Sequence, residues 1–365
     1  MPNERNTTLI RDEEAAVKSR GEALRDYVIR RLLLMIPTFL GITLVTFTLL
    51  QFVPGGQIDQ IRMDLAGAGG GGEVGGGGGA IAQLVIPEDQ LAQLTEYYGF
   101  DQPLPVAYAS WLWDVVRLDF GESFRYSEPV LQVIRERLPV SIYYGLITAF
   151  LTYGICIPLG ILKAIKHRTN VDNLTSVLIF VGYAVPGFAL GAVLSNLLAV
   201  RFEIFPLGGF QSVGAAELSF LARIWDIMWH SVLPLIAYLA GAFAVTTMLM
   251  KNSLIENMSA DYVKTALAKG MTWPRAVFGH ALRNSLIPIA TSFGNNISLI
   301  LTGSLLIERV FGIPGMGLLF FEAITARDYP VVMGYIFISS ALLLIGNLLS
   351  DLCVAGADPR VRFGE

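Results

Sequence analysis

The polar residues best placed to do chemistry lie in one segment between two apolar stretches. Asp261, Lys264 and Lys269 are followed by Gly270. An acid in the first turn, a base in the last turn and a glycine after it are typical of a short helix with a glycine stop. Ser259 is the predicted N-cap. The helix does no acid–base chemistry of its own, so we expect it to act by contact.

This helix is also predicted to be half apolar. Met258, Tyr262 and Ala266 recur at a spacing of four and share one face, with Val263 and Leu267 beside them. A helix of about ten residues cannot cross a membrane and is marginal alone in water. Its apolar face must be covered by the chain's own bundle, by lipid or by a cytoplasmic partner. Thr272 is predicted to cap a second helical piece.

A second set of polar residues falls inside an apolar stretch. The set is a stripe of hydroxyl and amide side chains formed by Thr291, Ser292, Asn295 and Ser298. These residues are candidates to line a water-filled path. Hydrogen bonds between neighbouring helices are the competing interpretation, and the sequence favours it.

The remaining charged candidates stand in two adjacent pairs. Glu308 precedes Arg309, and Arg327 precedes Asp328. Each pair is a candidate for an outer gate or for a contact with a binding protein, and local ion pairing is the alternative. The three histidines are scattered without ligand spacing, so no metal site is expected.

The composition places these residues in a membrane protein. The chain has 365 residues, of which 53% are hydrophobic and only 15% charged, with a mean hydropathy of +0.56. Soluble chains carry roughly 25% charge. The net charge of −4 excludes a nucleic-acid-binding surface. The dipeptide Gly-Lys never occurs, so the chain has no phosphate-binding loop of the P-loop type.

Six segments are apolar enough to cross a bilayer, which needs about 20 residues each. The predicted spans are 32–53, 140–165, 174–200 (interrupted by Pro186 and Gly187), 227–250, 286–307 and 331–354. With the N-terminus inside, 17 of the 26 Lys and Arg residues fall in cytoplasmic segments. The positive-inside rule therefore predicts six helices with both termini in the cytoplasm.

The predicted organisation follows from these spans. Residues 1–26 form a cytoplasmic tail, 27–53 the first membrane helix and 54–138 an extracytoplasmic segment. Residues 139–357 form a five-helix core with a cytoplasmic loop at 252–283, and 358–365 a second tail. Ten of the thirteen residues 67–79 are glycine, which indicates a flexible linker. Trp111 to Leu118 is predicted to be amphipathic, either on the outer membrane surface or in a small packed subdomain.

The loop at 252–283 also carries a family resemblance. The run Asp261–Gly270, followed by His280–Pro288, resembles the coupling loop of ABC importer permeases, and more narrowly the peptide/nickel branch. Similar matches occur at Arg30–Leu33, Phe52–Gly56, Gly99–Pro103, Leu118–Ser123, Glu308–Gly317, Arg327–Pro330 and Asp358–Arg360. The glycine-rich insert is similar to that of Yej-type permeases, a group associated with oligopeptides and microcin C.

The resemblance implies an all-α, polytopic type I importer permease in the bacterial inner membrane. Its implied partners are a second homologous permease, two ABC ATPase subunits that hold ATP and Mg, and a periplasmic or extracellular peptide-binding protein. The implied ATPase contacts are Asp261, Lys264, Thr265, Ala266, Ala268, Lys269 and Gly270. The broad family motif begins Glu-Ala-Ala where this chain has Lys264, Thr265 and Ala266, so no role is carried over for the missing Glu.

Three alternatives remain. A nickel or other small-solute permease of the same family fits the same motifs. An ion-coupled secondary carrier would need buried ionisable residues in its spans, which the sequence does not show. A structural membrane subunit without a transport path is the third. No cofactor is expected in this chain.

Overall fold

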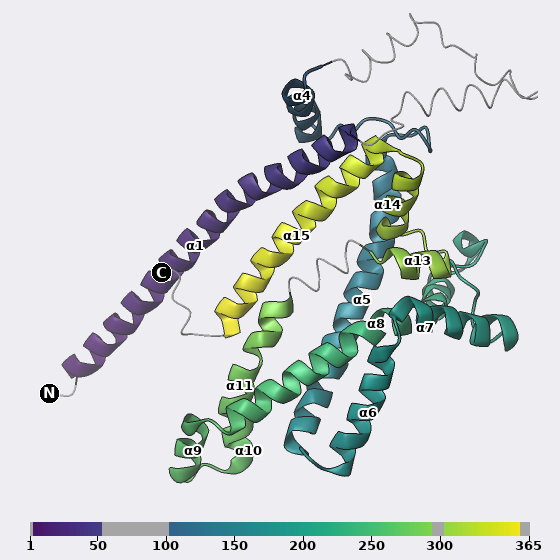
Figure 1. Cartoon of the computed structure of the whole chain (residues 1–365). Helices are drawn as coiled ribbons and strands as arrows, with labels where there is room; N and C mark the ends of the chain where they lie inside the picture. Colours follow the sequence, from purple (N-terminus) through teal and green to yellow (C-terminus); the bar gives the residue numbers. More distant parts are fainter. Residues whose placement is uncertain (1–2, 53–101, 294–302, 358–365) are drawn as a thin grey trace, which may run out of the picture. The chain divides into compact units, whose positions relative to one another are not determined.

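The computed structural model describes residues 3–52, 102–293 and 303–357. Within these segments the regular secondary structure is helical, apart from one isolated β-bridge between Glu122 and Pro129 (Figure 1). The longer helices are α1 (Asn3–Gln51), α4 (Leu104–Val116), α5 (Val130–Ile165), α6 (Asn170–Ala184), α7 (Gly187–Leu194), α8 (Phe220–Met258), α9 (Asp261–Ala268), α14 (Met316–Thr325) and α15 (Tyr329–Ala357). The shorter helical pieces are η1 (Ser195–Arg201), η2 (Ala215–Glu217), α10 (Trp273–Ala276), η3 (Val277–Ala281), α11 (Leu282–Ser285) and α13 (Leu305–Phe311).

The chain forms two compact units. Unit 1 comprises Met1–Phe39, Pro139–Leu318 and Ser339–Glu365, and unit 2 comprises Leu40–Leu138 and Leu319–Ile338. The predicted glycine-rich linker at 67–79 lies outside the described residues.

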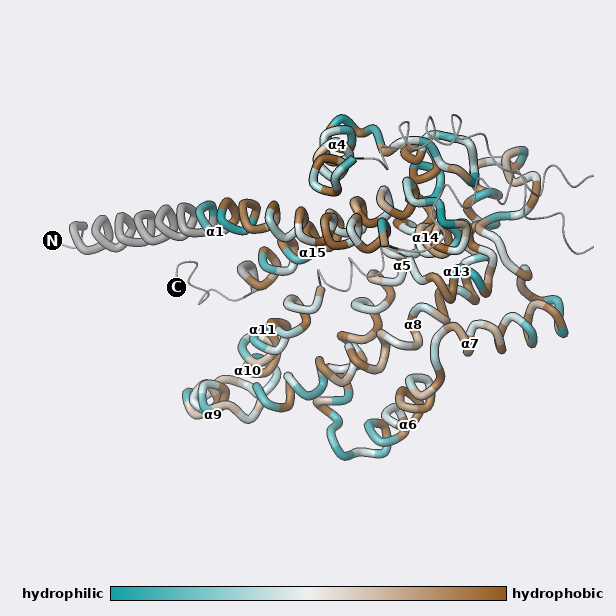
Figure 2. The backbone as a smooth tube through the Cα atoms, turned by 45° about the horizontal axis from the view of Figure 1, so that its top comes forward, coloured by the Kyte–Doolittle hydropathy of each residue, from teal (hydrophilic) through white to brown (hydrophobic). Residues whose placement is uncertain are grey.

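Four helical segments in the described residues are long and apolar enough to span a membrane: Arg25–Gln51, Val130–Ile165, Phe220–Met258 and Tyr329–Val354. They correspond to the first, second, fourth and sixth predicted spans, and their apolar character is visible along the tubes in Figure 2. Two of them start earlier than predicted, since α5 begins at Val130 and α8 at Phe220. Helix α1 also continues back to Asn3, through the segment predicted as a tail.

The third predicted span, 174–200, is broken at Pro186 and Gly187, where the sequence predicts the interruption. Helices α6 and α7–η1 meet at a 90° bend. Val185 is extended, with φ −96° and ψ 122°, and Pro186 follows it. A residue before proline is pushed out of the helical region, and the proline has no N–H to donate, so the helix ends here.

The fifth predicted span, 286–307, is only partly described. Helix α11 ends at Ser285, a further helical turn runs to residue 293, and residues 294–302 lie outside the described residues. The six-helix topology therefore stays a prediction, as does the cytoplasmic location of the termini.

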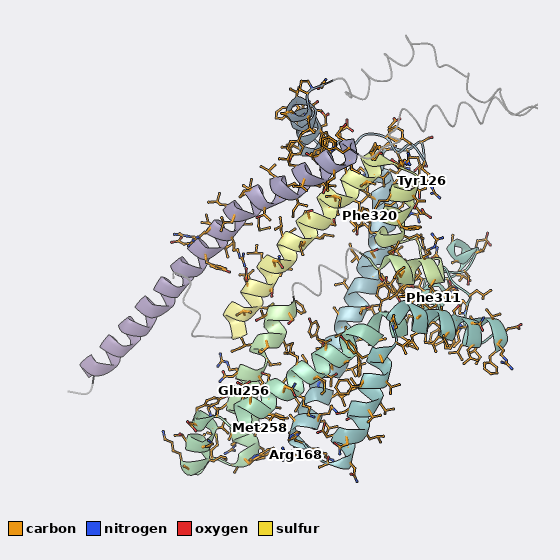
Figure 3. All side chains as sticks on the ribbon, in the orientation of Figure 1. Tyr126, Arg168, Glu256, Met258, Phe311 and Phe320 are labelled. Carbon is orange, nitrogen blue, oxygen red and sulfur yellow. The ribbon has the colours of Figure 1, made fainter. Side chains whose placement is uncertain are left out.

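Two apolar clusters lie among the described residues of unit 1. The Phe311 cluster is centred on Tyr144, Leu233, Ala237, Phe311 and Ile313. The Met250 cluster is centred on Met250, Leu254, Val263, Val277 and Ala281. Figure 3 shows Phe311 on α13 beside α7. The two helices approach closely because a Cβ on Gly191 would stand 2.9 Å from the Phe311 ring.

In unit 2, α4 packs on the end of α1. The Tyr108 hydroxyl lies 2.9 Å from the Thr43 hydroxyl, and its ring stacks on Trp111 at 5.9 Å. This contact favours a packed subdomain, although Trp113 and Val116 are exposed. The amphipathic segment was predicted to run to Leu118, but α4 ends at Val116 and Leu118 has φ 64°. The predicted end of this segment was therefore wrong.

Candidate functional site

The predicted contact helix is present as α9. Its end is a two-bond glycine cap: the Gly270 N–H donates to the Leu267 carbonyl at 2.9 Å, and the Met271 N–H donates to the Ala266 carbonyl at 3.1 Å. Gly270 has φ +85°, the left-handed conformation that this motif requires and that glycine adopts without strain. The predicted stop at Gly270 is confirmed.

The start of α9 differs from the prediction. The N-cap position is Ala260, which has no side chain to bond the first turn. Ser259 instead ends α8, and its hydroxyl donates to the Ile255 carbonyl at 3.0 Å. The N-cap prediction was wrong because the preceding helix runs on to Met258 and takes Ser259 as its own C-cap.

One face of α9 is covered by the chain itself. Val263 is buried in the Met250 cluster, and Ala266 packs against it. Thr265 donates to the Asp261 carbonyl at 2.8 Å within the helix. The chain's own bundle therefore covers part of the predicted apolar face, while Tyr262 and Leu267 remain exposed.

The opposite face of α9 carries charge and is open. Asp261, Lys264, Ala268 and Lys269 are exposed. Lys264 donates to Asp261 at 2.9 Å, and this bond holds the pKa of the Asp261 carboxyl below its usual range. An exposed pair of this kind contributes little to stability, so these charges are available to a partner surface.

The segment that follows α9 in the chain packs beside it. Thr272 occupies the N-cap position of α10 as predicted, although its side chain makes no cap bond. The chain then continues through the π-turn η3 into α11. Trp273 and Phe278 in this segment are about half exposed. π-helical turns such as η3 occur often at functional sites.

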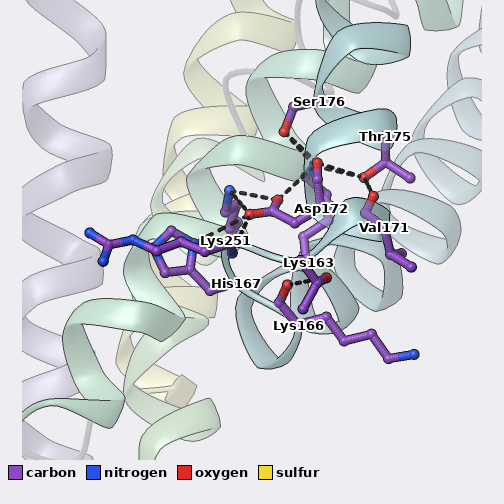
Figure 4. A network of polar contacts seen from close by, with 10 residues as sticks. Lys163, Lys166, His167, Val171, Asp172, Thr175, Ser176 and Lys251 are labelled. Carbon is purple, nitrogen blue, oxygen red and sulfur yellow. Dashed lines mark hydrogen bonds and ion pairs between the residues drawn. The ribbon is translucent and has the colours of Figure 1, made fainter.

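A buried ionic centre, which the sequence analysis missed, joins α5, α6 and α8 in unit 1 (Figure 4). Asp172 is 2% exposed and accepts from Lys251 at 2.7 and 2.9 Å. Lys163 is 0% exposed and stands 3.1 Å from the same carboxylate. Its ammonium also donates to the Thr175 and Ser176 hydroxyls at 2.8 Å.

This Asp172 centre explains why the lysines are not surface residues. Both lie at the predicted cytoplasmic ends of spans, a position in which lysine normally meets water or lipid headgroups. The sequence signal was an acid in the first turn of a membrane helix, nine residues after Lys163. The second lysine, Lys251, is 79 residues further along the chain, so spacing alone could not pair it with Asp172.

The polar stripe of the fifth predicted span is only half described. The Thr291 hydroxyl donates to the Ile287 carbonyl and the Ser292 hydroxyl to the Pro288 carbonyl, both at 3.0 Å. These bonds within one helix satisfy both hydroxyls. Asn295 and Ser298 lie outside the described residues, so the stripe as a pore lining stays a prediction.

Glu308 is a buried centre at the other end of unit 1. Its carboxylate is 1% exposed and accepts from the Leu318 N–H at 2.7 Å, with the Ser141 and Tyr238 hydroxyls at 3.5 Å. A Cβ on Gly315 would stand 2.5 Å from the carboxyl carbon, so the loop fits only without a side chain there. Burial raises the pKa of Glu308 to about 7.

Asp328 holds a turn in unit 2. It accepts from the Ser123 hydroxyl at 2.5 Å and from the Arg125 N–H at 3.2 Å. The Tyr126 hydroxyl, labelled in Figure 3, donates to Glu322 at 2.6 Å in the same unit. Asp328 is fully buried and Glu308 nearly so, while Arg309 is exposed and Arg327 partly buried. Burial of both acids favours a structural role over direct contact with a protein partner.

Long apolar helices, a bent apolar pair and a capped helix with an open charged face together define an all-helical polytopic membrane protein. A family model described as "Binding-protein-dependent transport system inner membrane component" matches residues 156–363. The chain belongs to this family of inner membrane transport components.

Three relatives match almost end to end. The chain is 40% identical to the peptidoglycan transport system permease protein YejB of Agrobacterium fabrum, covering 92% of this chain and 98% of the relative. It is 37% identical to the inner membrane ABC transporter permease protein YejB of Escherichia coli O157:H7, with the same coverage. It is 33% identical to the oligopeptide transport system permease protein AppB of Bacillus subtilis, covering 92% and 99%. These relatives are permease subunits, which are transport components rather than enzymes.

Proposed function

We propose that this chain is the permease subunit of an ATP-driven ABC importer for peptides, with α9 as the helix that couples it to an ATPase. The observation that carries the proposal is that α9 has one face packed on the chain and one face exposed to solvent. Val263 and Ala266 anchor one face in the Met250 cluster, and the other face presents Lys264, Ala268 and Lys269.

The shape of α9 suits a docking helix. Eight residues alone are far below the length at which a helix is stable in water, so the anchor on the Met250 cluster is what keeps α9 formed. The small side chain of Ala268 leaves room for close approach to a groove, and Lys264 and Lys269 offer positive charge to acids on its rim. The coupling contacts are thus Asp261, Lys264, Thr265, Ala266, Ala268, Lys269 and Gly270.

ATP and Mg belong to the ATPase partners in this proposal. The chain has no P-loop sequence, so energy for uphill transport must come from two nucleotide-binding subunits. Closure of those subunits would draw the coupling helices of two permeases together, and α8, which ends three residues before α9 starts, would carry the movement into the membrane.

The substrate follows from the relatives. Their names refer to peptidoglycan and oligopeptide transport, and a peptide is the chemistry these have in common. The proposal includes peptide-like antibiotics such as microcin C. A periplasmic or extracellular binding protein would deliver the peptide to this permease and a second homologous one. Nickel is the alternative within the family.

Subunit composition tests the proposal. The tagged chain is extracted from its native membrane in mild detergent, and co-purifying chains are identified by mass spectrometry. We expect an ATPase and a second permease in near-stoichiometric amounts. A chain that runs alone, or as a bare self-dimer in several gentle detergents, would contradict the proposal and favour a self-sufficient carrier.

A further inference from the structure

Polar and small side chains recur along the buried face of α5 within unit 1. At a spacing of three or four residues it carries Ser141, Tyr144, Thr148, Thr152, Cys156, Gly160 and Lys163, all of them buried. Large apolar side chains such as Leu146 and Phe150 are exposed on the same helix. A membrane helix of this kind turns its polar side inward, and the partner helix must satisfy that side.

Helix α8 covers this face. The Tyr144 ring stacks on Tyr238 at 5.7 Å, and the Cys156 thiol donates to the Phe243 carbonyl at 3.6 Å. A Cβ on Gly160 would stand 2.6 Å from the Met250 Cβ. The contacts advance along both helices together, so α5 and α8 run parallel and share one continuous seam.

Three buried hydroxyls lie in the middle of this α5–α8 seam. Thr148 and Thr152 lie on α5 between Tyr144 and Cys156, and Thr247 lies on α8, where its side chain contacts the Cys156 thiol. The three residues are 1%, 3% and 0% exposed. Within the part of the chain that the structure describes, the Thr148 and Thr152 hydroxyls have no hydrogen-bond partner. A buried hydroxyl left without a partner is costly, which makes two in successive turns of one helix unusual.

We infer that the α5–α8 seam binds internal water, with the hydroxyls of Thr148, Thr152 and Thr247 as its ligands. A buried water needs two to four polar partners, and these three hydroxyls supply that number. The seam is polar at both ends as well, because Ser141 contacts Glu308 and Lys163 contacts Asp172. Water in the middle makes the polar contact continuous from one buried centre to the other.

Internal water also has a mechanical consequence. Direct hydrogen bonds between two helices fix their register, whereas a bridging water can exchange partners when one helix shifts. The seam therefore allows α5 to slide along α8 without stranding a polar group in an apolar surrounding.

Radiolytic footprinting tests this inference on the purified full-length chain in its complex. Hydroxyl radicals made from bound water oxidise sulfur side chains beside it, and ¹⁸O-water reports exchange with bulk. We expect Cys156 and Met250 to be oxidised several-fold faster than Met333, which is also buried, at 4% exposed, but lies off the seam. Equal rates at the three sites would overturn the inference.

A valine series supplies a second readout. Thr152→Val keeps the shape of the side chain but removes the hydroxyl. We expect it to lower both the melting temperature and the oxidation of Cys156, because a water ligand is lost. Thr38→Val is the control, since the Thr38 hydroxyl is exposed and bonds to the Leu34 carbonyl at 3.0 Å. If Thr152→Val raises the melting temperature and leaves the oxidation of Cys156 unchanged, the seam is dry and the inference is wrong.

Discussion

At the scale of single residues, the Asp172 carboxylate balances the positive charge of a buried ionic centre. It is the one carboxylate in its centre, and it faces two buried ammonium groups, Lys163 and Lys251, with His167 at 3.3 Å. The centre already carries excess positive charge. Neutralising the acid would leave both lysines buried without a counter-charge, which is more damaging than removing the whole group.

Asp172→Asn is therefore predicted to destabilise the protein by about 3–5 kcal/mol, the usual cost of breaking a buried ion pair from one side. Thermal unfolding in detergent measures the loss. Asp114→Asn, at an exposed acid on α4, is the matched control and should change little. Adding Lys251→Met to Asp172→Asn should recover part of the stability. A single variant as stable as the control would contradict this account of the centre.

The burial of Glu308 should make the stability of the folded chain depend on pH. An ordinary Glu ionises near 4.5, whereas burial raises the pKa of Glu308 to about 7. Between these values the folded chain binds one more proton than the unfolded chain, so the free energy of unfolding falls as pH rises. The contribution is fully present below about 4.5 and is lost above about 7. Tyr144 and Tyr238, which face the carboxyl, are phenols that ordinarily ionise near pH 10 and stay neutral across this window.

Melting temperatures measured from pH 4.5 to 7.5 test this titration. Glu308→Gln cannot ionise, so its melting temperature should depend less on pH than that of the unchanged chain. The difference between the two curves should grow through the window. Parallel curves would show that another group causes the dependence.

At the scale of elements, a change at the C-terminal cap of α9 should affect coupling to the ATPase more than folding of the chain. Gly270 is exposed, has φ +85°, and a Cβ there would meet nothing within 4 Å. Gly270→Asp should thus cost only about 1–2 kcal/mol, the strain of a left-handed residue with a side chain. A tilted or frayed α9 would still disturb a docked partner.

We expect Gly270→Asp to insert and fold but to lose peptide uptake in reconstituted vesicles while the complex still hydrolyses ATP. Gly214→Asp is the control, because Gly214 has φ +86° and equally open space but lies far from α9 in the sequence. If both variants take up peptide normally, α9 is not the coupling element.

The ends of helices could be predicted from local sequence patterns, whereas the directions of helices could not. The stop at Gly270 and the position of Thr272 follow from short-range rules that act within a turn. The break at Pro186 was visible in the sequence, but its 90° angle was not. Proline ends a helix by local sterics, whereas the direction of the next helix is set by packing, as where Gly191 meets Phe311.

At the scale of the whole molecule, the membrane character could be predicted from the sequence. A chain crossing lipid must satisfy its backbone hydrogen bonds within a helix, so each span is a long apolar run. The buried charged centres could not be predicted from the sequence. Lys163, Asp172 and Lys251 belong to three different helices, and only the tertiary packing of α5, α6 and α8 joins them. Glu308 looked like half of an adjacent ion pair, but its neighbours are backbone N–H groups of a glycine-rich loop that the chain folds around it.

The central claim is that α9 carries the contact with the ATPase, and site-directed photocrosslinking tests it most directly. A photoreactive amino acid at Ala268, on the open face of α9, is compared with one at Val213, a fully exposed loop residue of the same unit. The account predicts crosslinks from Ala268 to an ATPase subunit and none from Val213. A complex that contains the ATPase but crosslinks it equally from both positions, or from neither, would contradict the claim.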